Sequence, residues 1–162
     1  MFKVGEKIFY PLHGAGRIIG IEEKEILGEK ESYYILDMTL KDLKVMIPVG
    51  KTASLEIREV VELDILDDAL AMFQHAEQTI QDIPYLQRQR VNVDKMKSGD
   101  IFEGVEVILD LTTRNSKKKL GIADKSMLHN AKQMLISELV VVKEIDIDEA
   151  TQLLRESSTT SM

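Results

Sequence analysis

The sequence has no cysteine and no tryptophan, and aromatic residues make up only 5% of its 162 residues. The absence of cysteine excludes disulfides, thiol catalysis and every zinc or iron–sulfur site built on cysteine. A hydrophobic core must therefore come mainly from Leu, Ile, Val and Met. No apolar run approaches the roughly 20 residues that a membrane-spanning helix needs, and the charged start of the chain is unlike a signal peptide. We expect a cytoplasmic protein.

The sequence also lacks a recognisable catalytic or metal-binding pattern. The three histidines, His13, His75 and His129, lie far apart, and no pair has the i, i+4 spacing of a helical zinc site. The glycines of segment 14–20 miss the spacing of a phosphate-binding loop, so we expect them to supply positive φ in a hairpin. We therefore expect no enzyme and no cofactor.

The net charge of −7 argues at first against a nucleic-acid partner. Its distribution is uneven. Residues 85–132 carry 10 Lys and Arg against 6 Asp and Glu, which gives +4, whereas residues 1–84 sum to −7 and residues 133–162 to −4. The basic middle segment fits either a solvated helical surface or a weak contact with nucleic acid.

The first third of the chain is typical of short strands joined by tight turns. Gly20 interrupts the second strand and indicates a bulge or a bend. We expect strands at 7–10, 17–26, 32–40, 43–49 and 55–60. Five short strands within about 60 residues favour a small SH3- or Tudor-like β barrel.

The remainder has helical spacing of its apolar residues. Helices are expected near Asp64, from Tyr85 to Lys97, after an Asp100 cap, from Ile122 or Ala123, and after an Asp146 cap. Residues 114–119 are expected to form a basic loop. The predicted fold class is α+β by domains, with a β module at 1–60, a compact all-helical domain of about five helices at 64–156, and a frayed tail at 157–162.

The opening run Phe2 to Gly16 (FKVGEKIFYPLHGAG) closely resembles the start of the CarD/CdnL family of bacterial transcription regulators. The run Leu43 to Pro48 resembles the strand that ends in that family's "vPv" segment. Residues within 127–139 resemble the "mL..Ar..l..EL" pattern of its helical domain. The N-terminal module alone is also similar to the polymerase-interacting domain of transcription-repair coupling factors, but no helicase motor follows here.

The resemblance implies that the β module binds the β subunit of RNA polymerase near its lobe. An exposed edge strand can pair backbone to backbone with a strand of its partner. Met46 stands where a basic residue is common in the family, so it either makes a soft apolar contact or belongs to the barrel itself. The polymerase-binding residues implied are Lys24, Leu43, Lys44, Val45, Met46 and Ile47.

The resemblance also implies that the helical domain touches promoter DNA at the upstream edge of the melted region. The family places a Trp wedge against the minor groove, and Tyr85 occupies that position here. Tyrosine can still offer an aromatic face to a distorted base step, although it could instead pack the helix start. Gln87 departs from a frequent Arg. The DNA-binding residues implied are Tyr85, Arg88, Arg90 and Lys125.

The leading hypothesis is a regulator that docks on RNA polymerase and stabilises the promoter open complex through weak, sequence-independent contacts. The alternative is a polymerase-binding adaptor without significant DNA contact, because the Trp is missing and the net charge is acidic. A third class, an enzyme or ligand sensor, would need a convergent polar pocket. We expect a monomer with no membrane partner, associated with the nucleoid through polymerase.

Overall fold

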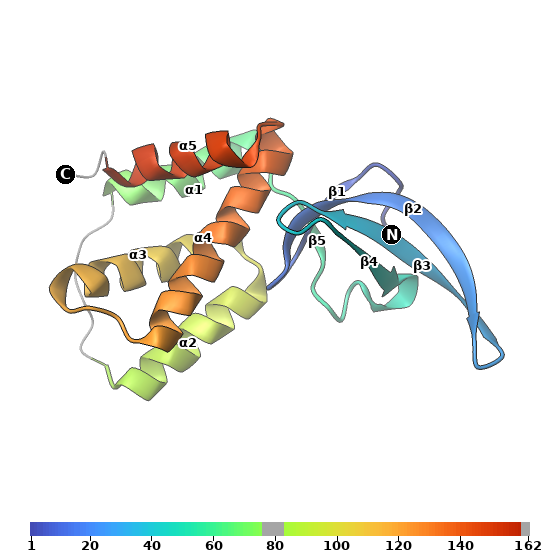
Figure 1. Ribbon diagram of the computed structural model, residues 1–162, viewed down its shortest axis with the longest axis horizontal. Helices are drawn as coiled ribbons and strands as arrows, with labels where there is room; N and C mark the ends of the chain where they lie inside the picture. The colour runs from blue at the N-terminus through green and yellow to red at the C-terminus, as the bar shows by residue number, and fades with distance from the viewer. Residues whose placement is uncertain (76–82, 160–162) are drawn as a thin grey trace.

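The computed structural model describes residues 1–75 and 83–159 (Figure 1). Within these residues the chain forms one five-stranded antiparallel sheet followed by five α-helices. The sheet is formed by about the first third of the chain, and the helices pack together beside it. The predicted fold class, a small Tudor-like β module followed by a helical module, is confirmed.

The five strands are joined in the order β4-β3-β2-β1-β5, so β4 and β5 are the edges of the sheet. Their bounds are β1 Lys7–Tyr10, β2 Gly14–Ile26, β3 Glu29–Met38, β4 Leu43–Pro48 and β5 Arg58–Glu59, with a short 3-10 helix η1 at Val49–Lys51. The last strand is shorter than predicted. Residues 55 and 56 lie in a turn instead, and the N–H groups of Leu55 and Ile57 donate to the carbonyls of Lys51 and Thr52.

Strands β2 and β3 form a long hairpin whose outer part extends beyond the rest of the sheet (Figure 1). The register shifts between Ile18 and Gly20, which confirms the predicted bulge. Residues 21–32 are all exposed. The hairpin turns through Leu27 and Gly28, whose φ values of 54° and 82° are those of a tight primed turn.

The helices are α1 Leu63–His75, α2 Tyr85–Ser98, α3 Ile101–Lys117, α4 Ile122–Lys143 and α5 Ile147–Thr159. The predicted cap at Asp100 is confirmed, since its carboxylate accepts from the backbone N–H of Phe102 at 2.8 Å. Asp146 likewise accepts from the backbone of Glu149 at 2.7 Å.

Two helices continue beyond their predicted ends. Helix α3 includes most of the expected basic loop, because Arg114 bonds back to Asp110 one turn earlier at 2.9 Å. Helix α5 runs to Thr159, three residues into the expected tail, and the Ser157 hydroxyl donates to the Leu153 carbonyl. Residues 160–162 lie outside the described part of the chain.

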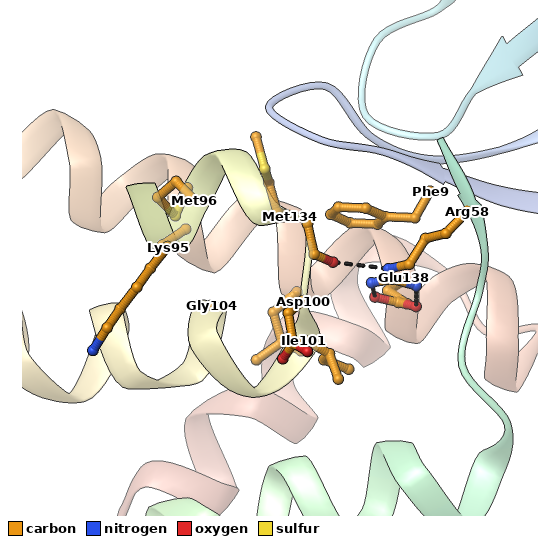
Figure 2. Close-up of a pocket in the computed structure, with 12 residues that line it drawn as sticks. Phe9, Arg58, Lys95, Met96, Asp100, Ile101, Gly104, Met134 and Glu138 are labelled. Carbon is orange, nitrogen blue, oxygen red and sulfur yellow. Dashed lines mark hydrogen bonds and ion pairs between the residues drawn. The ribbon is translucent and has the colours of Figure 1, made fainter. Parts of the chain in front are cut away.

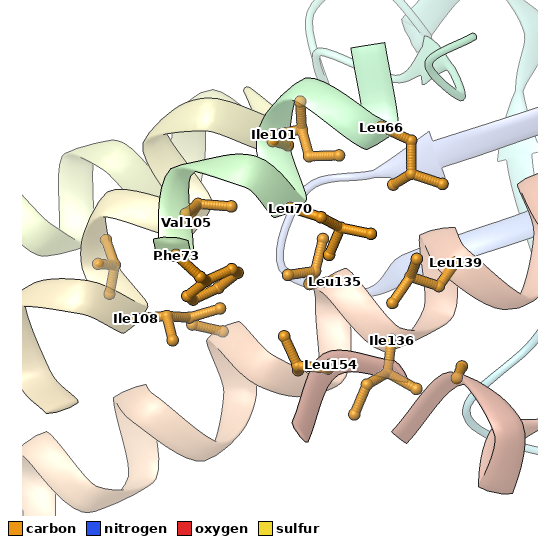
Figure 3. Close-up of a cluster of buried hydrophobic side chains, with 14 of the residues drawn as sticks. Leu66, Leu70, Phe73, Ile101, Val105, Ile108, Leu135, Ile136, Leu139 and Leu154 are labelled. Carbon is orange, nitrogen blue, oxygen red and sulfur yellow. The ribbon is translucent and has the colours of Figure 1, made fainter. Parts of the chain in front are cut away.

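Each module has its own hydrophobic core. In the β module the core is centred on Ile8, Ile18, Tyr34 and Leu36. In the helical module, side chains from all five helices meet, as Figure 3 shows for most of them. A third, smaller cluster joins the modules, since Phe9 and Ala15 of the sheet pack against Val141 of α4. Helix α4 therefore belongs to the helical core and also contacts the sheet.

Surface ion pairs cross the same junction. The Glu144 carboxylate at the end of α4 lies 3.3 Å from Lys7 Nζ and 3.6 Å from Arg17 Nη2. The hydrogen bond and the charge of Lys7, together with the charge of Arg17, lower the pKa of Glu144 below its ordinary value of 4.5. The stabilisation from these pairs is therefore present above pH 4.5 and is lost as the pH falls through the lowered pKa.

We expect the Lys7→Met substitution to raise the pKa of Glu144 toward its ordinary value, because the hydrogen bond and the nearer positive charge are removed. Carboxyl-detected NMR titration of the full chain would measure the change. A Lys3→Met variant is the control, since Lys3 is exposed and forms none of these ion pairs. An unchanged Glu144 pKa in Lys7→Met would mean that the ion pairs do not form in solution.

Candidate functional site

Strand β4 forms a free edge of the sheet. Within the described residues it pairs with β3 on one side, and no strand pairs with its other side. An edge strand presents unpaired backbone N–H and C=O groups, which can bond to a strand from another protein. The edge strand expected around residues 43–47 is therefore present.

The side chains of β4 alternate between the core and the surface. Ile47 is only 5% exposed and belongs to the core, and Val45 packs against the same core. Met46 points the other way and is 39% exposed, so it is a surface residue. This burial corrects in part the prediction that Val45 and Ile47 bind polymerase. Ile47 can offer a partner only its backbone, and most of the Val45 side chain is taken up by the core. The β4 side chains available to a partner are those of Leu43, Lys44 and Met46.

The outer face of the sheet carries an apolar stripe around Met46. In the strand register, Met46 lies opposite Ile35, and Pro48 lies opposite Tyr33. Residues two apart on a strand share a face, so these four side chains form one surface, called here the outer stripe. Gly20 lies beside Ile35 and has no side chain to cover it. Sequence reasoning missed Ile35 and Tyr33, although the alternation in β3 could have indicated them.

Lys24 lies on the same face as the outer stripe, farther out along the β2–β3 hairpin. Glu22 is paired with Tyr33 of the stripe, and Lys24 is two residues beyond Glu22 on the same strand. The Lys24 ammonium is exposed, opposite Glu31 and 3.8 Å from the Glu22 carboxylate. The structure thus places Lys24 and Met46 on one continuous face.

The aromatic candidate Tyr85 is the first residue of α2 and is 48% exposed. The guanidinium of Arg88 lies 5.0 Å from the centre of the Tyr85 ring, within range of a cation–π contact. Tyr85 is therefore supported from its own helix while half of its surface remains open to a partner.

Arg88 is not on the surface. It is only 8% exposed, and its Nη1 lies 3.1 Å from Oδ2 of Asp124, which is itself 3% exposed. Asp124 belongs to the first turn of α4, so this buried ion pair ties the starts of α2 and α4 together. The prediction that Arg88 contacts DNA is therefore revised: its guanidinium is committed to Asp124 and to the Tyr85 ring.

The starts of α2 and α4 lie side by side in Figure 1. Leu86 and Ile122, in the first turns of these helices, are 72% and 88% exposed. Each is followed on its own helix face by an exposed basic residue, Arg90 four residues after Leu86 and Lys125 three residues after Ile122. We call the set Tyr85, Leu86, Arg90, Ile122 and Lys125 the helix-start surface. Sequence reasoning missed Leu86 and Ile122, because only the structure shows that they lie outside the core.

The exposed lysines 117–119 lie at the end of α3 and in the loop that follows it, and add positive charge next to the start of α4. Oδ1 of Asp124, by contrast, is buried without a hydrogen-bond partner among the described residues. The helix-start surface therefore combines apolar side chains with surrounding basic groups, over one buried carboxylate. Such a surface is suited to a nucleic acid whose bases are partly unstacked.

A small pocket between the two modules has a volume of about 30 Å³, room for a few water molecules at most (Figure 2). Its lining is mostly apolar, with Phe9, Met96 and Met134 among the residues. This cavity is too small to serve as the polar pocket that a ligand sensor would need. Among the described residues, no group of three or more His, Asp or Glu side chains could hold a metal ion. No described helix is long and apolar enough to span a membrane.

Comparison with protein families gives two matches that together cover most of the chain. Residues 2–61 match the model of the CarD-like/TRCF RID domain, and residues 68–155 match that of the CarD C-terminal domain. A curated relative, the "Putative transcription factor YdeB" of Bacillus subtilis (strain 168), is 46% identical over 145 residues, which cover 90% of this chain and 94% of the relative.

Two solved structures from Myxococcus xanthus are similar to part of the chain. One is described as CdnLNt; it is 38% identical, covers 38% of this chain and 86% of its own, and has a TM-score of 0.33. The other is the NMR structure of the 72-residue N-terminal domain of CarD; it is 30% identical, covers 36% of this chain and 79% of its own, and has a TM-score of 0.31. The family matches and the curated relative confirm the resemblance found in the sequence.

Proposed function

Because the chain belongs to the CarD family of bacterial transcription factors, we propose that it docks on the β subunit of RNA polymerase and stabilises the promoter open complex. Members of this family are transcription factors and not enzymes, so the expectation of a non-enzyme is confirmed by family membership. The observation that carries the DNA part of the proposal is the half-exposed Tyr85, held at a helix start by the buried Arg88–Asp124 pair.

In the proposed docking step, the free edge of β4 adds to a strand of the polymerase β lobe. Backbone hydrogen bonds along an edge strand give affinity, and side chains on alternate positions give specificity. The outer stripe around Met46 and Ile35 supplies an apolar contact, and Lys24 supplies a cation farther along the same face. The β module at residues 1–60 is the docking unit.

In the proposed DNA step, the Tyr85 ring acts as a wedge against the minor groove at the upstream edge of the melted region. Leu86 and Ile122 extend the apolar contact beside it, since apolar side chains can hold a distorted base step open. Arg90 and Lys125 contact phosphates, and Arg88 positions the ring. The helical module at residues 64–156 is the DNA-contacting unit.

With two basic residues on phosphates, DNA binding by the protein alone is weak, independent of sequence and salt-sensitive. Each phosphate contact contributes about 0.9 to the slope of log affinity against log salt, so a slope of roughly −2 is expected. Docking on polymerase raises the local concentration of the helical module at the promoter and compensates for this weakness. The protein acts there as a monomer and reaches the nucleoid through polymerase.

The mechanism is a shift in population. In the open complex the bases at the upstream fork are unstacked, and the helix-start surface fits this fork. In the closed complex the same DNA is intact duplex. A protein that binds the open form more tightly shifts the equilibrium by its difference in affinity, and no bond is made or broken.

Substitutions of Tyr85 test the proposal. The protein is expected to increase the lifetime of the open complex, and Tyr85→Ala is expected to reduce that increase about tenfold. This factor is in line with the roughly 1–3 kcal/mol of an aromatic contact with a base. Tyr85→Trp, which has a larger ring, is expected to keep or increase it. The lifetime of complexes resistant to a DNA competitor measures the effect, at saturating protein and with polymerase binding checked separately. If Tyr85→Ala binds polymerase and extends the lifetime as the unmodified protein does, the alternative of an adaptor without DNA contact is favoured.

A further inference from the structure

A partly buried ion pair connects the two modules. Arg58 of β5 donates from Nη1 and Nη2 to the two carboxylate oxygens of Glu138 on α4, each at 2.8 Å (Figure 2). Glu138 is 1% exposed. A forked pair of this kind fixes direction as well as distance, because both hydrogen bonds require the guanidinium and carboxylate planes to be aligned.

Several other elements complete this pair. The backbone N–H of Val61 donates to Glu138 Oε2 at 2.9 Å, and Arg58 Nε donates to the Gly99 carbonyl between α2 and α3 at 2.8 Å. The Arg58 guanidinium also lies 4.4 Å from the centre of the Phe9 ring of β1. The network therefore joins both modules and the segment between them, so that a change in their relative orientation would break some of its hydrogen bonds.

Glycines allow the backbones of the two modules to approach closely beside this network. A Cβ added at Gly14 would lie 2.9 Å from the Ser137 hydroxyl oxygen of α4, and the next backbone N–H, that of Ala15, donates to that hydroxyl at 2.9 Å. A Cβ added at Gly99 would lie 2.8 Å from Pro11 Cγ. Both glycines also have positive φ, at 97° and 71°.

Helix α4 connects this junction to the helix-start surface. Asp124 supports that surface at one end of the helix, and Glu138 lies 14 residues later, about 21 Å along the axis. A tilt of roughly 10° at Glu138 would therefore displace the Asp124 end by about 4 Å. A displacement of that size is larger than the placement error a specific contact tolerates.

We propose that Arg58 and Glu138 are positioning residues that fix the angle between the modules. When the β module docks on polymerase, this angle places the helix-start surface at the upstream fork. The inference rests on the proposed function. A buried ion pair adds little net stability over apolar packing, but it can specify one geometry. If the angle is fixed before binding, the contact with DNA does not have to pay the entropy of ordering the two modules. The effective concentration of the helix-start surface at the DNA is then higher.

The absence of cysteine makes a direct measurement possible. Spin labels at Asp42→Cys and Asp148→Cys, both exposed and on different modules, report the inter-module distance distribution of the free full-length protein. We expect a narrow distribution in the parent and a broad one after Glu138→Ala. Arg58→Lys is a second variant, because it keeps the charge and loses the fork.

A second experiment tests function: it measures the lifetime of the open complex in the presence of the unlabelled variants. Glu138→Ala and Arg58→Lys are expected to retain their affinity for polymerase. Their effect on the lifetime of the open complex is expected to fall about tenfold, because the effective concentration of the helical module at the DNA is lower. The control is Val105→Ala, which destabilises the helical core without touching the junction, and which is expected to keep both the narrow distribution and the lifetime effect.

A distribution that stays narrow in both Arg58→Lys and Glu138→Ala would overturn the proposal, as would a full lifetime effect in a variant with a broad distribution. If the parent protein itself does not extend the lifetime, the proposed function fails. The distance distribution of the free protein would then still show whether the ion pair fixes the angle.

Discussion

The Met46→Glu substitution is expected to weaken binding to RNA polymerase by about 30-fold, which corresponds to roughly 2 kcal/mol. Met46 is 39% exposed and lies opposite Ile35 in the outer stripe beside the free edge of β4. A carboxylate at this position would be buried against the partner without a counter-charge, and the free protein would keep it in solvent. The loss should therefore appear in binding and not in folding.

The matched control is Asn130→Glu, which adds the same charge at an exposed position of α4 in the helical module. Surface-immobilised polymerase and the full-length variants give the two affinities under one salt condition. Equal binding by Met46→Glu and the parent protein would show that the outer stripe is not the docking surface.

The Asp124→Ala substitution is expected to lower the free energy of unfolding by about 3 kcal/mol, because it leaves the buried Arg88 guanidinium without its counter-charge. Arg88 and Asp124 are 8% and 3% exposed, and their ion pair joins α2 to α4. Arg90→Ala, at an exposed position of α2, should change stability by less than about 0.5 kcal/mol.

Urea unfolding of the two full-length variants measures this contrast. A large loss in Asp124→Ala and a small one in Arg90→Ala would assign Arg88 to the support of Tyr85 and leave Arg90 for phosphate. Similar small losses in both variants would mean that the buried pair does not hold the helix starts together.

The local features of the fold were predictable from the sequence because their causes are local. Asp100 and Asp146 bond to backbone N–H groups within three residues, and the Gly20 bulge interrupts a run of β-prone residues. The strand expected at residues 55–60 was mostly wrong, because backbone bonds to Lys51 and Thr52 turn the chain before Arg58. Those bonds follow from the path of the chain after β4 and have no signal in the apolar pattern.

The candidate surfaces were predictable only as positions along the chain. The resemblance placed Arg88 among the DNA contacts, but its burial depends on Asp124, which lies 36 residues away. The glycine-rich opening run was expected to shape a hairpin. Gly14 does have positive φ, but a Cβ added there would meet Ser137, which lies 123 residues later in the chain. Contacts of this range follow from the packing of the modules and not from spacing.

Permanganate reactivity of unpaired thymines provides a decisive measurement on a promoter that polymerase alone opens poorly. With saturating protein, we predict increased reactivity of the thymines across the melted region. Unchanged reactivity, in complexes where the protein is demonstrably bound to polymerase, would contradict stabilisation of the open complex.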